Sequence, residues 1–316
     1  MPDVSMAYFD QALNNVSIGY DNLDFVSPLI APFLPVDEPS GAIYAWGQEV
    51  FDLEETARAP KSEASEVASY SLNAFRFWCQ GQAKKDVISD EQRKMLSALP
   101  VNLDFTTTKN LNAKLRLRME YDWQAMLKAQ CPGTTLAGTG QWSDFQNSDP
   151  QAAVEAQKQN ILQATGKLPE FFLVSYPVHA KLSIHPVLKD IVKFGGGSIP
   201  FDGILTNEQL AKAFKVNRYI VASALVNTAN EGQSPTKQFI WGKDALLGYS
   251  PVEFNQLDPR LAATPRWSFG FPDAQGVLTK RWREESRTAD VIEVQMWYDK
   301  TLFVPAAGFY FSNASA

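Results

Sequence analysis

Residues 106–130 read TTTKNLNAKLRLRMEYDWQAMLKAQ, the longest uninterrupted helical pattern in the chain. Apolar side chains recur along it at spacings of three and four, which places them on one helix face: Leu111, Leu115, Met119, Trp123 and Met126. At 1.5 Å per residue, a helix of about 25 residues is roughly 37 Å long. Leu117 and Tyr121 form a second, thinner apolar face. We therefore expect this helix to lie between two layers, its own sheet and a neighbouring subunit.

The same segment carries signals for its ends and for its charged surface. The threonines at residues 106–108 can cap the first turn, and Pro132 and Gly133 end the helix. Two pairs of opposite charge at i,i+4, each stabilising by a few tenths of a kcal/mol, are expected on its surface: Arg116–Glu120 and Arg118–Asp122.

Composition is that of a globular protein, with 316 residues of which 45% are hydrophobic and 20% charged. No apolar run approaches the ~18 residues that span a bilayer, and the N-terminus lacks a basic segment followed by an apolar one. We expect neither a membrane span nor a signal peptide. Two cysteines, Cys79 and Cys131, are typical of a reducing compartment. The net charge of −6 argues against a surface that grips nucleic acid through many phosphates.

The beginning of the chain does not resemble a compact domain. Prolines recur every three or four positions through residues 27–40, which argues against a helix or a central strand. The apolar residues between them, including Phe33 and Leu34, need a surface to lie on. Two interpretations stay open: an N-terminal arm folded back on its own core, or an arm lying on a neighbouring chain.

Two β-like segments follow, at residues 42–46 and 69–80, where aromatic and polar side chains alternate. The acid-rich residues between them include Glu54, Glu55, Arg58 and Lys61. We expect a long two-stranded excursion with a loosely structured tip. Because an isolated hairpin is marginal in water, the alternatives are a plain surface loop or a flap that docks on a partner.

The rest of the chain predicts a short helix, an α/β lobe and C-terminal strands. Ser89 and Asp90 cap a helix at residues 89–99, and a second helix runs from Pro150 to a C-terminal Gly166. Further elements are expected as a strand at 171–175, helices at 177–184, 186–192 and 207–214, and strands at 219–226 and 239–247. Strands at 291–297, 301–304 and 308–311 are expected to pack beneath the long helix.

A search for chemistry finds no convergent site. His179 and His185, six residues apart, do not share a helix face as i,i+4 metal ligands would, so we expect a structural or solvent-exposed role for both. Residues 165–167 lack the upstream glycine of a phosphate loop. Two small basic patches occur: Lys84-Lys85 and Lys280-Arg281-Trp282-Arg283. The second is better interpreted as salt-bridged strand residues than as a nucleic-acid contact. We predict no catalytic, cofactor-binding or metal-binding residue, and no enzymatic activity.

The order and spacing of several short motifs resemble the major capsid proteins of tailed bacteriophages, which have the Hong Kong 97-type fold. The motifs are FVSPLIAPFLPV at 25–36, RAP at 58–60, LRLRMEYDW at 115–123, WSD at 142–144, NSDP at 147–150, ATG at 164–166, and VNTA at 226–229 followed by EG at 231–232. They cover roughly residues 20–312. Each is short and carries no chemistry, so the match depends on their arrangement.

The resemblance implies an α+β chain with named parts. They are an N-terminal arm at 1–40, an extended β-hairpin loop at 41–87, a peripheral domain at 88–149 and 273–316 with a spine helix at 106–130, and an α/β axial domain at 150–272. The subunit interface is then expected at Phe33, Leu34, Glu54, Glu55, Arg58, Lys61, Arg116 and Arg118. The absence of a long charged helical leader indicates a separate scaffolding protein.

The implied function is assembly into hexameric and pentameric capsomers of an icosahedral phage head that encloses double-stranded DNA without sequence-specific binding. The implied partners are other copies of the chain, a scaffolding protein, a portal and, optionally, a decoration protein. The implied location is the virion, after synthesis in the bacterial cytoplasm. Two other classes stay open. One is an encapsulin-like nanocompartment shell. The other is a compact α/β enzyme with a dispersed site and a radius of gyration of about 20 Å.

Overall fold

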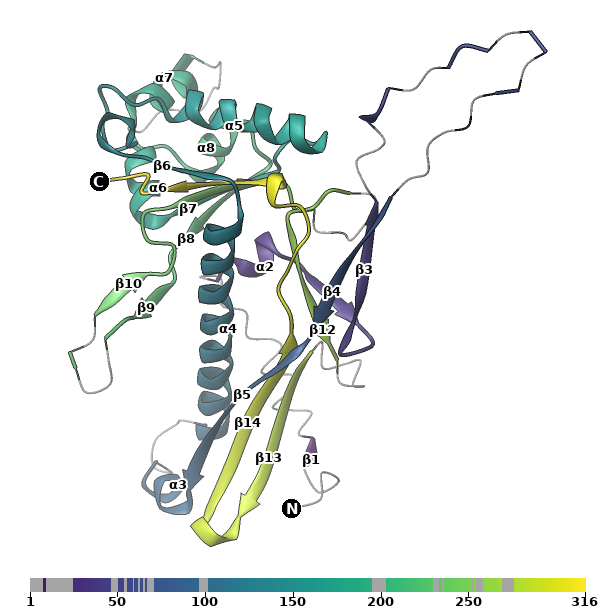
Figure 1. Cartoon of the computed structure of the whole chain (residues 1–316). Helices are drawn as coiled ribbons and strands as arrows, with labels where there is room; N and C mark the ends of the chain where they lie inside the picture. The colour runs from purple at the N-terminus through teal and green to yellow at the C-terminus, as the bar shows by residue number, and fades with distance from the viewer. Residues whose placement is uncertain are drawn as a thin grey trace.

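The long helix α4 (Leu103–Gln130) stands between two β-sheets and sets the long axis of the molecule (Figure 1). The computed structural model describes residues 8–9, 25–46, 51–53, 56–58, 60–61, 63–64, 66, 71–96, 102–194, 203–229, 233–234, 236–251, 253, 258–268 and 276–316. The arrangement is a mixed α+β architecture, in which one helix contacts the cores of both sheets.

α4 begins at Leu103, before the threonines that were expected to cap it. Asn102 is the N-cap, because its side-chain oxygen accepts from the backbone N–H of Phe105 at 3.2 Å. Thr108 lies inside the helix and donates to the carbonyl of Asp104 at 2.8 Å. The buried stripe is Leu111, Leu115, Met119, Trp123 and Leu127. The predicted last member, Met126, is only half-buried, because the spacing of four continues to Leu127.

One sheet lies along α4 and joins seven strands of the described chain in the order β1–β13–β14–β12–β15, with β2 on β12 and β5 on β14. Its strands are β1 (Tyr8–Phe9), β2 (Phe33–Val36), β5 (Gln80–Ser89), β12 (Ala262–Trp267), β13 (Val277–Glu284), β14 (Ala289–Tyr298) and β15 (Thr301–Leu302). β14 alternates as predicted, and Ile292, Val294 and Met296 are buried in the core that surrounds α4. The prediction that this strand packs against the helix is confirmed.

The second sheet lies at the C-terminal end of α4, with the strand order β6–β16–β11–β7–β8 (Figure 1). Its strands are β6 (Gly133–Thr135), β7 (Phe171–Ser175), β8 (Arg218–Ala222), β11 (Ala245–Gly248) and β16 (Gly308–Ser312). Four helices accompany it: α5 (Pro150–Thr165), α6 (Tyr176–Leu182), α7 (Pro186–Phe194) and α8 (Asn207–Ala213). Every residue of β7 is buried, because Phe171 and Leu173 face the core around α4 whereas Phe172 and Val174 face the helices.

The helix ends in this lobe follow the local sequence. Asp149 caps α5 by accepting from the N–H groups of Gln151 and Ala152, each at 3.0 Å. Gly166 ends α5 with a φ of 68°, a left-handed conformation in which glycine carries no side-chain penalty. A capping box begins α8, as residues 206–209 predict.

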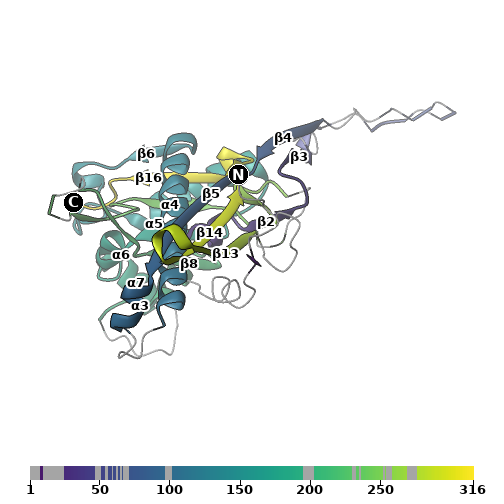
Figure 2. The same ribbon diagram turned by 90° about the horizontal axis from the view of Figure 1, so that it is seen from below.

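Two β-hairpins leave the body of the molecule (Figures 1 and 2). β3 (Ser40–Trp46) pairs antiparallel with β4 (Leu72–Trp78) in a ribbon that stands out from the first sheet. β9 (Leu225–Asn227) pairs with β10 (Lys237–Phe239) beside the second sheet. The expected strand at 219–226 is therefore divided between β8 in the sheet and β9 in this ribbon. Of the expected strand at 239–247, only Phe239 lies in β10 and residues 245–247 lie in β11, with a turn between them.

Among the described residues, two short α-helical segments and three 3₁₀ turns complete the fold. A helical turn α2 (Ser27–Ile30) forms despite its proline, because Pro28 occupies the first turn, where its missing N–H is not needed. α3 (Asp90–Leu96) begins as predicted, with the Ser89 hydroxyl accepting from Gln92 N–H at 3.2 Å. Short 3₁₀ turns occupy Gly138–Gly140, Glu285–Arg287 and Pro305–Ala307.

β16 was expected to pack beneath the long helix and complete the first lobe with the other C-terminal strands. It does pack against α4, through Tyr310, but it does not join the first sheet. It lies in the second sheet, antiparallel to β11 and parallel to β6. The physical reason is its two-sided burial: Tyr310 faces the core around α4, whereas Phe311 packs on Trp142 and the helices.

Candidate subunit interface

Residues 25–36 of the N-terminal arm lie on their own chain. Val26 and Ile30 are buried in the core around α4, and β2 runs parallel to β12. The Thr264 hydroxyl also donates to the carbonyl of Ala31 at 3.0 Å. Folding back on the chain is therefore the correct alternative for this part of the arm. Residues 10–24 lie outside the described chain.

Phe33 and Leu34, which were expected at a subunit contact, both have partners in their own chain. The guanidinium carbon of Arg266 lies 3.4 Å from the centre of the Phe33 ring, and Phe33 is 36% exposed. Leu34 is half-buried against the cluster at the base of the β3–β4 hairpin. Phe33 is one of the exposed apolar side chains of this segment, with Leu29 at 46% exposed, and its role in assembly stays a prediction.

Glu120 forms a buried junction between three distant segments. Its carboxylate is fully buried, and its two oxygens accept from the backbone N–H of Ser27 at 2.7 Å and from the indole N–H of Trp241 at 2.6 Å. Burial raises the pKa of Glu120, and these donors partly oppose that rise. The carboxylate therefore ties the segment at Ser27 and the segment at Trp241 to α4. The sequence signal for this burial was the position of Glu120 three residues before Trp123, at the border of the apolar stripe of α4.

The two charge pairs predicted on α4 behave differently. Arg118 pairs with Asp122 as predicted, at 3.1 Å, and its side chain is 67% exposed. Asp122 also forms an ion pair with Lys300, at 3.4 Å. The prediction of a surface ion pair between Arg116 and Glu120 is wrong, because the Glu120 carboxylate is buried between Ser27 and Trp241. Arg116 is half-buried and Arg118 is exposed, so Arg118 is the more accessible of the two predicted contact residues.

The β3–β4 hairpin has one covered face and one open face. Ile43 and Phe77 are buried at its base against Phe303 and Ala263, a group that we call the hairpin-base cluster. The opposite face carries exposed apolar side chains: Trp78 (67% exposed), Leu72 (52%) and Tyr44 (47%). Towards the tip, Arg58 and Lys61 are exposed, whereas the predicted Glu54 and Glu55 lie outside the described residues.

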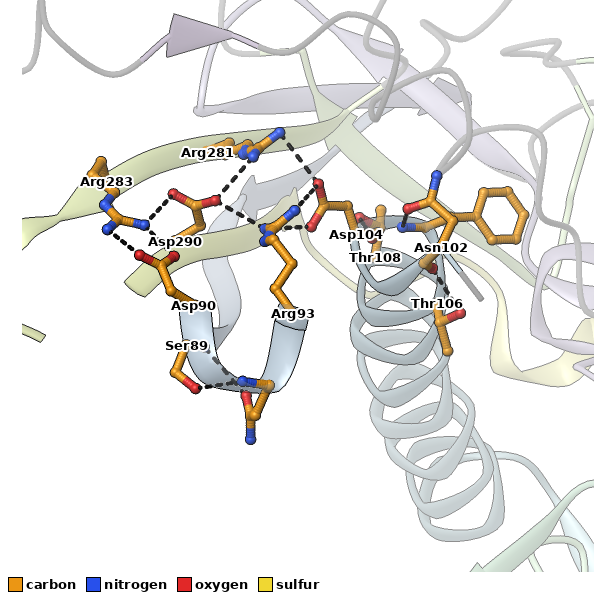
Figure 3. Close-up of polar contacts among 12 residues, drawn as sticks. Ser89, Asp90, Arg93, Asn102, Asp104, Thr106, Thr108, Arg281, Arg283 and Asp290 are labelled. Atoms are coloured by element: carbon orange, nitrogen blue, oxygen red, sulfur yellow. Dashed lines mark hydrogen bonds and ion pairs between the residues drawn. The ribbon is translucent and has the colours of Figure 1, made fainter. Parts of the chain in front are cut away.

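An ionic cluster joins the far ends of α3, α4 and the β13–β14 hairpin (Figure 3). Asp104, in the first turn of α4, binds Arg93 at 2.9 Å and Arg281 at 3.3 Å. Asp290 binds the same two arginines, at 2.9 and 3.0 Å. Arg283 forms a two-pronged pair with Asp90, which holds the pKa of that carboxyl below its ordinary value. The basic strand segment is thus salt-bridged, as its preferred interpretation predicted.

Two open grooves flank α4. The larger, about 520 Å³, lies between β5 and α4, and we call it the β5–α4 groove; its polar lining residues are Lys84, Lys85, Asp86, Asn110 and Lys114. The smaller, about 410 Å³, lies between β4 and the C-terminal half of α4, where Arg76, Met126 and Lys300 line it. Both are open surface depressions.

The described residues hold no group of three or more His, Cys, Asp or Glu side chains arranged to bind a metal ion. Of the helices that the structure describes, none combines the length and the apolar character needed to cross a bilayer. His185 is buried beside the Ser148 hydroxyl at 3.2 Å, and His179 lies 3.2 Å from the Tyr219 hydroxyl. Burial lowers the pKa of both histidines. These hydroxyl contacts are consistent with the structural roles predicted for them.

Comparisons with known proteins give one consistent result, although no family model matches the chain. The major capsid protein of Burkholderia phage BcepMu is 25% identical over 259 residues, which cover 77% of each chain. A phage-related protein from Bordetella bronchiseptica is similar in structure, with a TM-score of 0.75 and 20% identity over 98% of both chains. The mature capsid of bacteriophage PhiM1 gives a TM-score of 0.54 at 10% identity, covering 90% of this chain and 85% of its own.

An encapsulin is also similar in structure. The SrpI encapsulin from Synechococcus elongatus gives a TM-score of 0.52 at 12% identity, covering 98% of this chain and 97% of its own. The fold is therefore the Hong Kong 97-type fold that capsids and encapsulins share. In sequence the chain is similar to a phage major capsid protein, so of the two classes that share the fold the phage capsid is the better supported.

Proposed function

We propose that the chain, as a phage major capsid protein, assembles into hexameric and pentameric capsomers of an icosahedral head that encloses double-stranded DNA. The observation that carries this proposal is the β3–β4 hairpin, whose outer face exposes Trp78, Leu72 and Tyr44. A two-stranded ribbon with an uncovered apolar face is marginal in water and gains stability when a neighbour covers it.

Ring-forming contacts are heterologous, so one surface of a subunit meets a different surface on the next copy. The hairpin and the grooves beside α4 supply two such different surfaces on one chain. The expected contact residues keep this role in the proposal: Phe33 and Leu34 of β2, Glu54, Glu55, Arg58 and Lys61 in the sequence between β3 and β4, and Arg116 and Arg118 on α4. The division into arm, extended loop, peripheral and axial domains belongs to the same proposal, with β16 assigned to the axial lobe.

The partners and the location of the protein, and its lack of enzymatic activity, are also inferred. Capsid homologues form self-associating shells and belong to the virion. We infer a scaffolding protein, a portal and, optionally, a decoration protein as partners, with synthesis in the bacterial cytoplasm. The homologues are structural proteins, and we infer that this chain carries no enzymatic activity. Its packaged DNA is held without sequence-specific contacts, in keeping with a net charge of −6.

The test is assembly of the purified chain, followed by negative-stain microscopy and sedimentation, alone and with its scaffolding protein. Replacing residues 49–68 by a short glycine-asparagine turn should leave a folded subunit, by circular dichroism, that forms no closed shells. Shells formed equally well by the shortened chain would refute the role of the hairpin. A uniform monomer of the intact chain under both conditions would refute the proposed function itself.

The second candidate, an encapsulin-like nanocompartment, is favoured only by the shared fold. The contents of purified particles distinguish the two. Nuclease-protected DNA supports a phage head, and a co-purifying enzyme without DNA supports a nanocompartment.

A further inference from the structure

Residues 25–39, which we call the strap, connect the body of the molecule to the β3–β4 hairpin. The strap begins with the turn α2, where Val26 and Ile30 are buried in the core around α4. α2 contacts both α4 and β12 (Figure 1). The strap ends at Pro39, directly before β3. It is therefore placed to transmit a change in the body of the molecule to the hairpin.

Two buried hydrogen bonds fix the start of the strap to α4 and to the first sheet. The Ser27 N–H donates to the Glu120 carboxylate at 2.7 Å, and the Thr264 hydroxyl donates to the Ala31 carbonyl at 3.0 Å. All four residues are buried. Because a buried polar group that loses its partner is costly, these two anchors resist breaking.

Arg218, the first residue of β8, attaches the strap to the second sheet. Its guanidinium donates to the carbonyl of Leu29 at 3.2 Å and to the carbonyl of Ser250 at 2.7 Å, and it forms an ion pair with Glu170 at 3.5 Å. Leu29 is 46% exposed, whereas the other two anchors are buried. Because water can replace a donor at an exposed carbonyl, the Arg218–Leu29 hydrogen bond is the easiest of the three anchors to break.

The far end of the strap is fixed to the base of the hairpin. The Trp267 indole N–H donates to the carbonyl of Asp37 at 2.9 Å. The N–H of Cys79, directly after β4, donates to the carbonyl of Pro39 at 2.7 Å. Leu34 of β2 also packs against the hairpin-base cluster. Ordered contacts therefore run from α2 to the hairpin.

We propose that the strap couples the direction of the β3–β4 hairpin to the second sheet, with the Arg218–Leu29 hydrogen bond as a latch that can open. When the latch is closed, the strap is bound to α4 and to both sheets. When it is open, the strap stays bound to α4 and β12, and the second sheet can change its angle to the hairpin. The apolar contacts around α4 are non-directional, so they permit a small rotation that a directional hydrogen bond resists.

This inference rests on the proposed function, which gives the latch its purpose. Hexamers and pentamers require different angles between neighbouring subunits, so a chain that forms both needs an element with two positions. A latch at an exposed carbonyl provides such an element, because its open and closed positions differ little in free energy. Arg218 is thus a positioning residue for the hairpin, which it does not touch.

The experiment measures how well the hairpin is held relative to the second sheet in the monomeric, full-length chain. Spin labels at Asn73→Cys on β4 and Lys212→Cys on α8, both exposed positions, report their separation by double electron–electron resonance. The native cysteines, Cys79 and Cys131, are buried and are not labelled in the folded chain. Hydrogen exchange followed by mass spectrometry is the second readout, compared between the β3–β4 hairpin and β11.

The main variant is Arg218→Met, which removes the donors to the strap. Arg218→Gln is the second variant, since its side chain is too short to reach the Leu29 carbonyl, and it keeps the test open if Arg218→Met does not fold. Glu170→Gln is the matched control, because it removes the ion pair of Arg218 but leaves the bond to Leu29. Circular dichroism establishes that each variant is folded.

Both Arg218 variants should broaden the distribution of label distances about twofold and speed hydrogen exchange in β3 and β4 by about fivefold or more, with exchange in β11 unchanged. The control should match wild type in both readouts. A merely local role of Arg218 would raise exchange in β8 and leave the hairpin unchanged. In assembly with the scaffolding protein, Arg218→Met should give shells of mixed diameter, because the angle is no longer restricted.

Two results would overturn the inference. A folded Arg218 variant with wild-type label distances and wild-type exchange in the hairpin would exclude the coupling. Equal broadening in Glu170→Gln would assign the effect to the ion pair and not to the strap. A wild-type chain that never assembles refutes the proposed function, whereas the measurements on the monomer still decide whether the latch exists.

Discussion

Replacing Glu120 by alanine should destabilise the subunit strongly, because this carboxylate joins three segments in the interior. The substitution removes the acceptor for the Ser27 N–H, at 2.7 Å, and for the Trp241 indole N–H, at 2.6 Å. Both donors then remain buried without a partner. Ser27 is 1% exposed and Trp241 is 0% exposed, so water does not replace the lost acceptor.

The expected loss follows from those two donors. An unsatisfied buried donor costs about 1–3 kcal/mol, so two cost about 2–6 kcal/mol, and the smaller side chain adds a cavity. Removing a buried carboxylate recovers part of this, because its burial is itself unfavourable. We therefore expect the free energy of unfolding to fall by about 4 kcal/mol. With a urea slope of about 3 kcal/mol per molar, the midpoint shifts by about 1.3 M.

The assay is urea unfolding monitored by tryptophan fluorescence, at a concentration where the chain is monomeric. Glu120→Gln keeps the side-chain volume and one acceptor, so it should lose about half as much as Glu120→Ala. Arg118→Gln is the control on the same helix, and it should change the free energy by less than about 0.5 kcal/mol because its ion pair is exposed. A Glu120→Ala chain as stable as the control would refute the junction as a source of stability.

The remaining predictions concern the same interior and two other buried polar groups. Burial raises the pKa of Glu120 above its ordinary 4.5, so the folded state binds this proton more tightly than the unfolded state does. The free energy of unfolding of the wild type should therefore fall as the pH rises from 4.5 towards the raised pKa. Glu120→Gln should lack that fall when urea unfolding is measured as a function of pH. Lys158 is 4% exposed and its ammonium donates to the carbonyls of Phe214 and Lys215, so Lys158→Met should lose about 1–3 kcal/mol in urea unfolding, and an equally stable variant would contradict this reasoning. Asp290→Asn removes the charge that Arg93 and Arg281 share and should cost about 1–3 kcal/mol by thermal unfolding, whereas Glu285→Gln, with its side chain 81% exposed, should cost less than about 0.5 kcal/mol.

Elements with strong local signals were predictable from the sequence. The alternation of β14 identified its buried side, and Asp149, Pro150 and Gly166 marked both ends of α5. The long helix was also recognised, but its first residue was not, because its cap is Asn102 and the threonines are interior. In each correct case, the sequence pattern and the structural feature that it predicts lie within a few residues of each other.

The candidate interface was predictable only in part. Composition and alternation predicted a projecting acidic hairpin, and the β3–β4 ribbon has that form. The β5–α4 groove was not predictable, because Lys84 and Lys114 belong to separate elements that meet only in the folded chain. The Glu120 junction was missed for the same reason, since residue 120 looks like half of an ordinary surface pair until Ser27 and Trp241 are placed beside it.

The amino-acid sequence by itself determined the long helix α4, the capped helices α5 and α8 and the paired hairpin strands, because periodicity, caps and turns act over a few residues. Only the tertiary structure decided that residues 25–36 fold onto their own chain, that β16 completes the second sheet, and that Glu120 is buried. These outcomes depend on which apolar faces bury one another across hundreds of residues, and no local pattern specifies that choice.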